Sequence, residues 1–168
     1  MRVLHVMAGA NEGGAEHIKL QSALALAEAG VDQAVVTRSE NEFRVAKFNT
    51  AGVRVATAGF SKLWPFPTQA AIARMIREFK PDVAEYWMGR AGEFAPASFR
   101  SRSIGWYGGY YKLKRFANCE WHVGLTKDLL RHIREQGVPE NRSAIIHTYA
   151  DFEGVAPVDR ATLNTPKD

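Results

Sequence analysis

The sequence predicts an α/β protein in which a Rossmann-like parallel sheet of about seven strands carries helices on both faces. Short apolar runs of four to seven residues alternate with longer segments of helical periodicity as far as Asp151. Glycine or proline stands where the long helical segments should end, at Gly30, Pro81 and Gly137. This alternation is typical of strands that are buried between two layers of helices.

Each expected strand is a run of β-branched and other apolar residues that ends at polar residues or glycine. The first is Arg2–Ala8 (RVLHVMA), and the other six are expected at 33–38, 53–57, 82–87, 103–107, 121–125 and 143–148. Each expected helix carries apolar residues three and four positions apart. The helices are expected at 15–29, at 43–49, from a capping Thr68 to Phe79, and from a capping Thr126 to the residue before Gly137.

Length and composition exclude several classes of protein. The 168 residues, 46% of them hydrophobic and 24% charged, suit one domain with a substantial core. No run of about 18 apolar residues could cross a membrane, and Met1 leads into a strand rather than a signal peptide. The single cysteine, Cys119, excludes an internal disulfide, so a reducing, cytoplasmic location is expected. The net charge of +4 favours anionic partners.

The character of the chain changes after Asp151. Residues 1–151 make up the expected Rossmann-like domain, whereas residues 152–168 show no periodicity and contain two prolines. We therefore expect residues 152–168 to be a linker that leads toward a further domain.

The strongest local motif is the glycine-rich turn between the first strand and the first helix, with Gly9, Gly13 and Gly14. Backbone N–H groups at such a turn can approach an anion closely, and the helix dipole favours negative charge there. An alanine and a glutamate replace the Walker A lysine and hydroxyl, which excludes an ATPase of that class, and no GxGxxG spacing occurs. Two alternatives remain: an NAD(P)-type Rossmann domain, with Arg38 as its selector, and a tight turn without a ligand.

Five short motifs, taken in their order and spacing, resemble family-4 glycosyltransferases of the GT-B fold. They are GGAE at 13–16, KPDV at 80–83, VGLTKDLL at 123–130, GVP at 137–139 and SAII at 143–146. The likeness covers residues 1 to about 151 and corresponds to the N-terminal, acceptor-side half of such an enzyme. The segment WYGGYYKLK at 106–114 further resembles bacterial members that build lipopolysaccharide core or related surface glycans.

The resemblance implies a retaining, metal-independent transferase that uses a nucleotide sugar as donor substrate and no other cofactor. It implies a bacterial surface glycan or glycolipid as acceptor. The family's C-terminal donor-binding domain, with its basic pair and spaced carboxylates, has no counterpart in these residues, so this chain alone is expected to be inactive. The family closes its last strand with PNGxD, whereas residues 147–151 are HTYAD and keep only the aspartate.

The candidate site residues follow the strands, because ligands bind outside the carboxyl ends of the strands in open α/β sheets. Gly13 and Gly14 are expected to contact the donor's phosphate or sugar. The expected acceptor-binding residues lie at the start of the first helix and around the ends of the fourth and fifth strands: His17, Glu85, Trp87, Arg90, Tyr107, Gly108 and Lys112. The leaving phosphate can itself accept the acceptor's proton, so the sequence assigns no catalytic residue, and it assigns no metal.

A further segment, residues 94–119, combines basic and aromatic residues without any acid. It holds five cations, with aromatic residues interleaved from Trp106 to Phe116. Such a segment suits an anionic membrane surface, here the inner face of the plasma membrane, because basic side chains attract anionic headgroups and aromatic rings suit the interface. Two alternatives remain. One is a non-enzymatic module for anionic lipid or nucleic acid, with nucleic acid the less favoured partner. The other is a solvated loop over a packed aromatic cluster.

Overall fold

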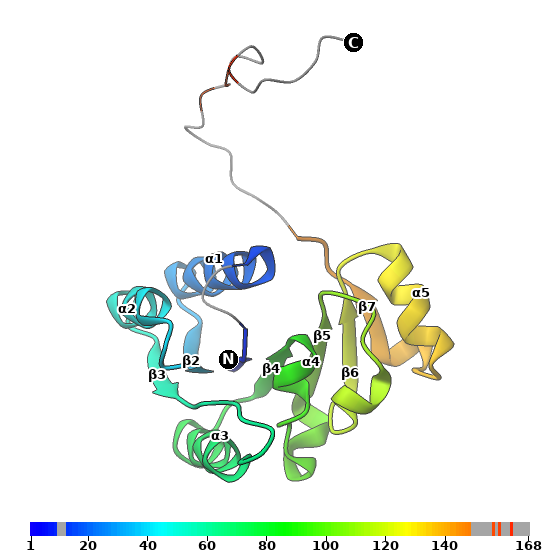
Figure 1. Ribbon diagram of the computed structural model, residues 1–168, viewed down its shortest axis with the longest axis horizontal. Helices are drawn as coiled ribbons and strands as arrows, with labels where there is room; N and C mark the ends of the chain where they lie inside the picture. Colours follow the sequence, from blue (N-terminus) through cyan, green and yellow to red (C-terminus); the bar gives the residue numbers. More distant parts are fainter. Residues whose placement is uncertain (10–12, 149–155, 157, 159–161, 163–168) are drawn as a thin grey trace.

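A parallel sheet forms the centre of the molecule. The computed structural model describes residues 1–9, 13–148, 156, 158 and 162, and within them seven strands form one sheet in the order β3-β2-β1-β4-β5-β6-β7 (Figure 1). All neighbouring strands run parallel. The strands are β1 (Arg2–Met7), β2 (Asp32–Thr37), β3 (Arg54–Thr57), β4 (Val83–Trp87), β5 (Ser103–Tyr107), β6 (Trp121–Gly124) and β7 (Ser143–Ile145). The predicted fold class is confirmed. The linker expected at 152–168 lies outside the described residues, apart from positions 156, 158 and 162.

Helices join the strands and lie on both faces of the sheet. The α-helices are α1 (Gly14–Glu28), α2 (Glu42–Thr50), α3 (Phe66–Phe79), α4 (Met88–Gly92) and α5 (Lys127–Glu135). The 3₁₀ helices are η1 (Ala97–Arg102), η2 (Leu113–Phe116) and η3 (Glu140–Arg142). In Figure 1, α1 and α2 lie on one face of the β1–β3 half of the sheet and α3 lies on the other. None of the helices in the described residues is long and apolar enough to span a bilayer.

Side-chain caps fix the starts of two helices, one of them as predicted. Thr126 caps α5, where its hydroxyl accepts a hydrogen bond from the N–H of Leu129 at 3.1 Å. Asn41 caps α2 in the same way, through the N–H of Arg44.

The predicted cap at Thr68 is wrong. Helix α3 begins two residues earlier, at Phe66, and Pro67 suits its first turn because proline has no N–H to leave unbonded. Thr68 is buried inside that turn, and its hydroxyl accepts a hydrogen bond from the N–H of Phe60 at 3.0 Å. The threonine therefore holds the preceding loop against the helix instead of starting the helix.

Alternate residues of each central strand enter two separate cores. On one face, Leu4, Val6 and Tyr86 pack with Ile72 of α3 in the larger core. On the other face, Met7 and Val35 pack with residues of α1 and α2, among them Leu20, Ala23 and Phe48. This alternation follows from the two-residue repeat of a strand.

The two halves of the sheet differ in how their faces are covered. On the face that carries α1, the side chains of Trp87, Trp106 and Val123 form a third, small cluster beyond the helix. Trp87 and Trp106 stack with their ring centroids 4.5 Å apart. Within the described residues, no helix packs over this face of β5–β7, and Trp121 and Ile146 are exposed there. One face of this half is therefore partly open.

Candidate functional site

The predicted site residues gather at the carboxyl edge of the sheet, because all seven described strands end at the same edge. The glycine turn follows β1, Trp87 ends β4, and Gly108 follows β5. Two hollows described by the structure open on either side of α1. The first contains Gly13 and His17, and the second contains Glu85 and Trp87.

The first hollow has a volume of about 300 Å³ and lies between α1 and the start of α2. Its lining residues are Gly13, Glu16, His17, Leu20, Asn41, Phe43 and Arg44. Gly13, Gly14 and His17 are exposed. A methyl group built on Gly14 would meet nothing within 4 Å, so packing within the domain does not require glycine there.

The Glu16 side chain lies against two glycines of the motif, Gly9 and Gly13. A methyl group built on Gly9 or on Gly13 would overlap the Glu16 carboxylate, which therefore lies against both glycines. This carboxylate stands at the first turn of α1, where the helix dipole favours an anion. A phosphate that binds at this helix terminus would have to displace the Glu16 side chain.

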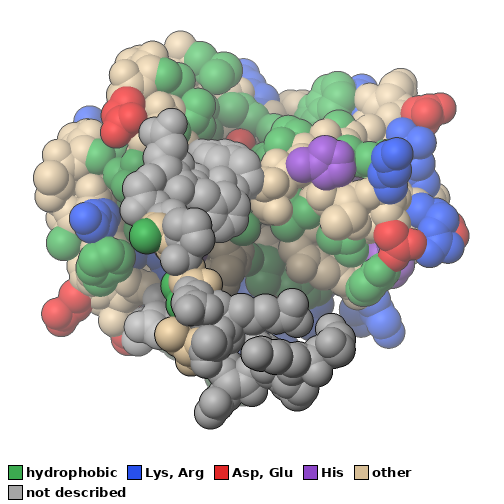
Figure 2. All heavy atoms as spheres, turned by 90° about the horizontal axis from the view of Figure 1, so that it is seen from above, with side chains coloured by type: hydrophobic (Ala, Val, Ile, Leu, Met, Phe, Trp, Pro, Cys, Tyr) green, Lys and Arg blue, Asp and Glu red, His purple; other side chains and the backbone are tan. Residues whose placement is uncertain are grey.

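The second hollow has a volume of about 440 Å³ and lies beside α1, over the open half of the sheet. Apolar groups from Ile18, Trp87, Trp106 and Leu125 dominate its walls, and His147 lies at its end. Figure 2 shows hydrophobic side chains between the α1 side and the α5 side of the molecule. Flat aromatic walls of this kind suit the apolar face of a sugar ring or of a lipid-linked glycan.

A buried ionic network forms the floor of the second hollow. The Lys19 ammonium pairs with the Glu85 carboxylate; the Lys19 side chain is almost completely buried, and that of Glu85 is 14% exposed. Glu85 Oε2 also accepts a hydrogen bond from Trp87 Nε1 at 3.3 Å and lies 3.1 Å from His5 Nδ1. On the far side of the imidazole, His5 Nε2 lies 2.7 Å from Gln33 Oε1.

Charges in the network decide the protonation states. Burial by itself would raise the pKa of Glu85, but the Lys19 charge and the hydrogen bonds from His5 and Lys19 hold that pKa well below its usual value. Burial lowers the pKa of Lys19, and Glu85 opposes this effect. Burial and the Lys19 charge lower the pKa of His5. Glu85 is thus an ionised anchor that fixes Lys19 and the indole of Trp87.

Lys19 and Trp87 face each other closely in this arrangement. The Lys19 ammonium lies 4.5 Å from the centroid of the Trp87 ring and 5.7 Å from that of Trp106. The cation therefore holds the two tryptophans in place through ring contacts as well as through Glu85.

The remaining predicted site residues are distributed around the β4 and β5 ends. Arg90 pairs with Glu93 at 2.8 Å, and Lys112 is exposed. Gly108 is exposed beside the sulfur of Met88. Met88 itself has a left-handed backbone (φ 67°) directly after β4, a conformation that costs free energy for a residue with a side chain and is often found near functional sites.

Tyr107 lies away from both hollows. Its side chain is fully buried in the larger core, where the ring packs against Phe116 and the hydroxyl lies 3.2 Å from His122 Nδ1. The expected contact of Tyr107 with an acceptor does not fit this position, since β5 directs the side chain to the core face. We do not include Tyr107 in the candidate site.

Most of the aromatic residues in segment 94–119 also belong to the core. Trp106, Tyr107 and Phe116 are buried, and among the five aromatic rings from Trp106 to Phe116 only that of Tyr110 is exposed. Arg115 forms an ion pair with Glu93 at 2.7 Å, so an acid from outside the segment neutralises part of its charge. Of the interpretations of this segment, a loop over a packed aromatic cluster fits the structure best.

The sequence did not indicate that Lys19, Trp106 and Arg44 would line the two hollows. Lys19 and Ala23 lie one turn apart on the buried side of α1, and a lysine in an apolar helical stripe is the signal that could have revealed a buried cation. Trp106 and Arg44 gave no such signal, because only the contacts between strands and helices place them at the hollows.

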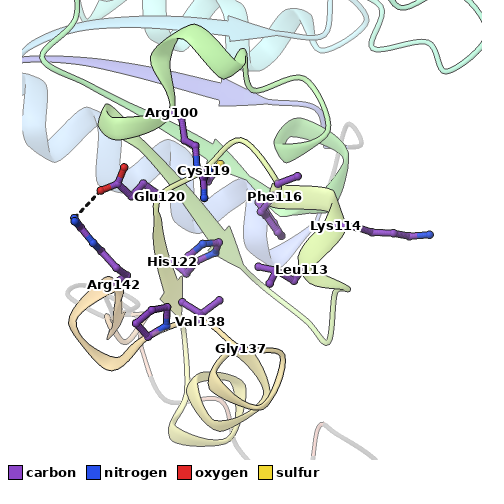
Figure 3. Close-up of a pocket in the computed structure, with 12 residues that line it drawn as sticks. Arg100, Leu113, Lys114, Phe116, Cys119, Glu120, His122, Gly137, Val138 and Arg142 are labelled. Atoms are coloured by element: carbon purple, nitrogen blue, oxygen red, sulfur yellow. Dashed lines mark ion pairs between the residues drawn. The ribbon is translucent and has the colours of Figure 1, made fainter.

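A larger hollow, of about 660 Å³, lies at the opposite edge of the sheet. Figure 3 shows Arg100 reaching toward Cys119, with His122 and Phe116 nearby, and Lys114 pointing away. Arg142 pairs with Glu120 at 2.8 Å on its rim. None of the predicted site residues lines this hollow. In the described part of the chain, no group of three His, Cys, Asp or Glu side chains could hold a metal ion.

Comparison with known proteins relates the whole chain to part of larger enzymes. No family model matches the chain. It is 32% identical over 169 aligned residues to the lipopolysaccharide core biosynthesis glycosyltransferase LpsD of Rhizobium meliloti (strain 1021), and 30% identical to LpsE of the same strain. Each alignment covers 100% of this chain and 49% of the relative. The chain thus spans about half the length of the curated relatives it matches.

Solved structures show the same fold. HepE of Anabaena, in complex with UDP-glucose, superposes with a TM-score of 0.70 over 91% of this chain and 45% of that one, at 14% identity. The lipopolysaccharide outer core galactosyltransferase WaaB gives 0.67 over 95% and 50%, at 11% identity. A glycosyltransferase of Rickettsia africae gives 0.68 over 87% and 42%, at 15% identity.

The sequence similarity and the sheet topology lead to the same assignment, and both match only about half of the larger proteins. In fold and in sequence, the chain thus matches an N-terminal domain of the GT-B fold, of the type found in lipopolysaccharide core glycosyltransferases.

Proposed function

We propose that this chain is the acceptor-side domain of a nucleotide-sugar-dependent glycosyltransferase that adds a sugar to lipopolysaccharide core or to a related bacterial surface glycan. The observation that carries the proposal is similarity along the full chain to half of two lipopolysaccharide core glycosyltransferases. The two hollows at the carboxyl edge support it, since ligands of open α/β sheets bind at that edge. The buried Cys119 suits the reducing cytoplasm, where we place the reaction.

The two hollows suggest a division of tasks. Gly13, which lines the first hollow, and its neighbour Gly14 approach the donor's phosphate or sugar from the side of this domain. His17 in the first hollow and Trp87 in the second contact the acceptor, with Arg90, Gly108 and Lys112 along the same edge. Glu85 acts through Lys19 and Trp87, because its carboxylate is already occupied by buried partners.

The chemistry we propose needs no protein nucleophile. The bond between the donor's anomeric carbon and the phosphate oxygen breaks, and the acceptor's hydroxyl oxygen bonds to that carbon on the same face. The hydroxyl proton passes to the departing phosphate, and the nucleoside diphosphate leaves. The protein contributes position and charge stabilisation, which can lower a barrier substantially without covalent chemistry.

Because the chain matches about half the length of its relatives, we expect the 168 residues alone to bind a nucleotide sugar weakly and to transfer none. The glycine turn can supply only a few charge-assisted contacts. Isothermal titration of UDP-glucose into the chain should show no micromolar binding. Tight binding would mean that this domain holds the donor itself, contrary to the acceptor-side assignment.

Gly14→Val in an enzyme that contains both halves tests the donor contact. A side chain at Gly14 meets open space within the domain, so the variant should fold, and its turnover should fall by roughly tenfold or more if the donor approaches this position. Gly59→Val is the matched control, because a side chain at Gly59 also meets nothing within 4 Å. Equal turnover of the two folded variants would remove Gly14 from the site.

A further inference from the structure

The loop between β3 and α3, together with the first residue of α3, exposes three large apolar side chains that lie close together in the sequence. Leu63 is 96% exposed, Trp64 is 64% exposed and Phe66 is 62% exposed. Scattered apolar residues are ordinary on a protein surface, but a cluster of this kind usually marks a site of interaction. We call residues 61–66 the apolar loop.

The base of the apolar loop is firmly attached to the core. Phe60, directly before it, is 1% exposed and meets Phe94 edge to face with centroids 5.5 Å apart. The N–H of Phe60 donates to the Thr68 hydroxyl, as described above. The projecting side chains are therefore presented by a fixed support.

Local contacts also shape the tip of the apolar loop. The N–H of Trp64 donates to the Ser61 hydroxyl at 3.2 Å, and the rings of Trp64 and Phe66 meet edge to face at 5.4 Å. Pro65 restricts the backbone between the two aromatic residues. The two rings thus form one apolar projection with Leu63 beside them.

The charge around the apolar loop is positive. Lys62 is exposed within it, and the Arg38 guanidinium lies beside it, donating to the Gly59 carbonyl at 2.9 Å. No acidic residue occurs in the chain between Glu42 and Glu78, so the segments that flank the loop in the sequence add no negative charge to it. An apolar tip flanked by cations is complementary to an apolar layer beneath anionic headgroups.

The shape of the loop favours a bilayer over a peptide or a small ligand. Leu63, Trp64 and Phe66 line none of the three hollows described above. Tryptophan, with an apolar ring and one N–H, is suited to the boundary between headgroups and acyl chains. The loop leaves β3 at its carboxyl end, the same edge of the sheet that carries the glycine turn.

We propose that the apolar loop docks this domain on the surface of an anionic phospholipid bilayer, with Leu63, Trp64 and Phe66 inserted among the headgroups and Lys62 bound to the anionic lipid. This position differs from segment 94–119, whose aromatic residues are mostly buried. Docking is independent of sugar transfer, so binding to vesicles tests it whether or not the proposed transferase activity is found.

The first test is flotation of the 168-residue chain with vesicles of phosphatidylglycerol and phosphatidylcholine in equal amounts, beside vesicles of phosphatidylcholine alone. The wild-type chain should float with the anionic vesicles. The triple variant Leu63→Ser, Trp64→Ser, Phe66→Ser should bind them at least roughly tenfold more weakly, because three apolar anchors are lost. Lys62→Gln should weaken binding by about fivefold, and mainly to the anionic vesicles.

Tyr110→Ser is the matched control. Tyr110 is 66% exposed, which is similar to the exposed fraction of Trp64. It lies in segment 94–119 and not in the apolar loop, so its replacement should leave vesicle binding unchanged. Thermal unfolding by circular dichroism should show that all variants are folded, since every replaced side chain is exposed. Equal flotation of the triple variant and the wild type would overturn the proposal, and so would a loss of binding in Tyr110→Ser alone.

Tryptophan fluorescence gives an independent measurement. The other tryptophans are 87, 106 and 121, so the difference between wild type and Trp64→Phe isolates the signal of Trp64. Lipids with a quencher on the upper acyl chain should reduce that difference signal. Sedimentation shows whether the loop joins two copies of the chain instead: a dimer that the triple variant abolishes, without quenching by lipid, would also overturn the proposal.

Discussion

The apolar loop and segment 94–119 contain similar residues in opposite environments. Both combine aromatic side chains with cations. In the apolar loop, Trp64 and Phe66 project into solvent, whereas in segment 94–119 Trp106 and Phe116 are buried. Composition therefore does not decide which aromatic residues form a surface. The decisive difference is that β5 is a strand of the sheet and η2 packs beside α4, whereas Leu63 and Trp64 lie in the connection between β3 and α3 and Phe66 is the first residue of α3.

Phe116 shows why the second segment cannot present its rings. Its ring occupies space that side chains on Gly92 and Gly105 would fill, because a methyl group built on either glycine would overlap it. Tyr107 packs against the other side, with centroids 4.3 Å apart. Gly92 of α4 and Gly105 of β5 thus leave space for the Phe116 ring, and only the tertiary fold brings these two glycines together.

The largest expected difference between the two regions is in the free energy of unfolding that is lost in Phe116→Ala compared with Phe66→Ala. Loss of a fully buried phenylalanine should lower the free energy of unfolding by about 3–5 kcal/mol, because it removes apolar contact and leaves a cavity. The exposed Phe66 should change it by about 0.5 kcal/mol or less. Urea unfolding of both variants measures the difference. Comparable losses would show that the apolar loop packs more tightly than its exposure indicates.

The second effect concerns His122, which contacts the buried Tyr107. Burial lowers the pKa of His122 to about 4 from an ordinary value of 6.5. Between these values the unfolded chain binds a proton that the folded protein does not, so the free energy of unfolding should fall as the pH is lowered from 6.5 and level off near 4. The loss from this residue should reach roughly 3 kcal/mol.

Comparing urea unfolding of the wild type and His122→Gln from pH 7 down to pH 4 isolates this contribution. The variant should lack that part of the decline but keep the part contributed by His5, whose pKa is lowered in the same direction. Parallel curves for the two proteins would mean that His122 has the same pKa in the folded protein as in the unfolded chain.

The smallest effect is expected for the charges of segment 94–119. Arg115→Gln removes the 2.7 Å ion pair with Glu93, in which both side chains are about one-third exposed. The free energy of unfolding should fall by less than about 1 kcal/mol, since water and salt screen such pairs. A loss as large as that of Phe116→Ala would contradict the view that packing, rather than charge, holds this segment.

The candidate site shows how far sequence could locate function. The glycine turn was found from the sequence because residues close together in the chain create it, and the structure places Gly13 and His17 in one hollow. The prediction at the end of β4 also reached residues that line a hollow, Glu85 and Trp87. Their partners Lys19 and Trp106 were missed, because they come from a helix and a strand far away in the sequence.

The sequence by itself determined the alternation of strands and helices, because two- and 3.6-residue repeats of apolar side chains are local patterns. It also determined the cap at Thr126, which depends on residues three positions apart. The tertiary structure alone decided that Thr68 closes a loop, that Lys19 is buried on Glu85, and that Trp64 is exposed while Trp106 is not. The physical reason is that burial depends on which elements meet across the sheet, and those contacts join residues that no local pattern relates.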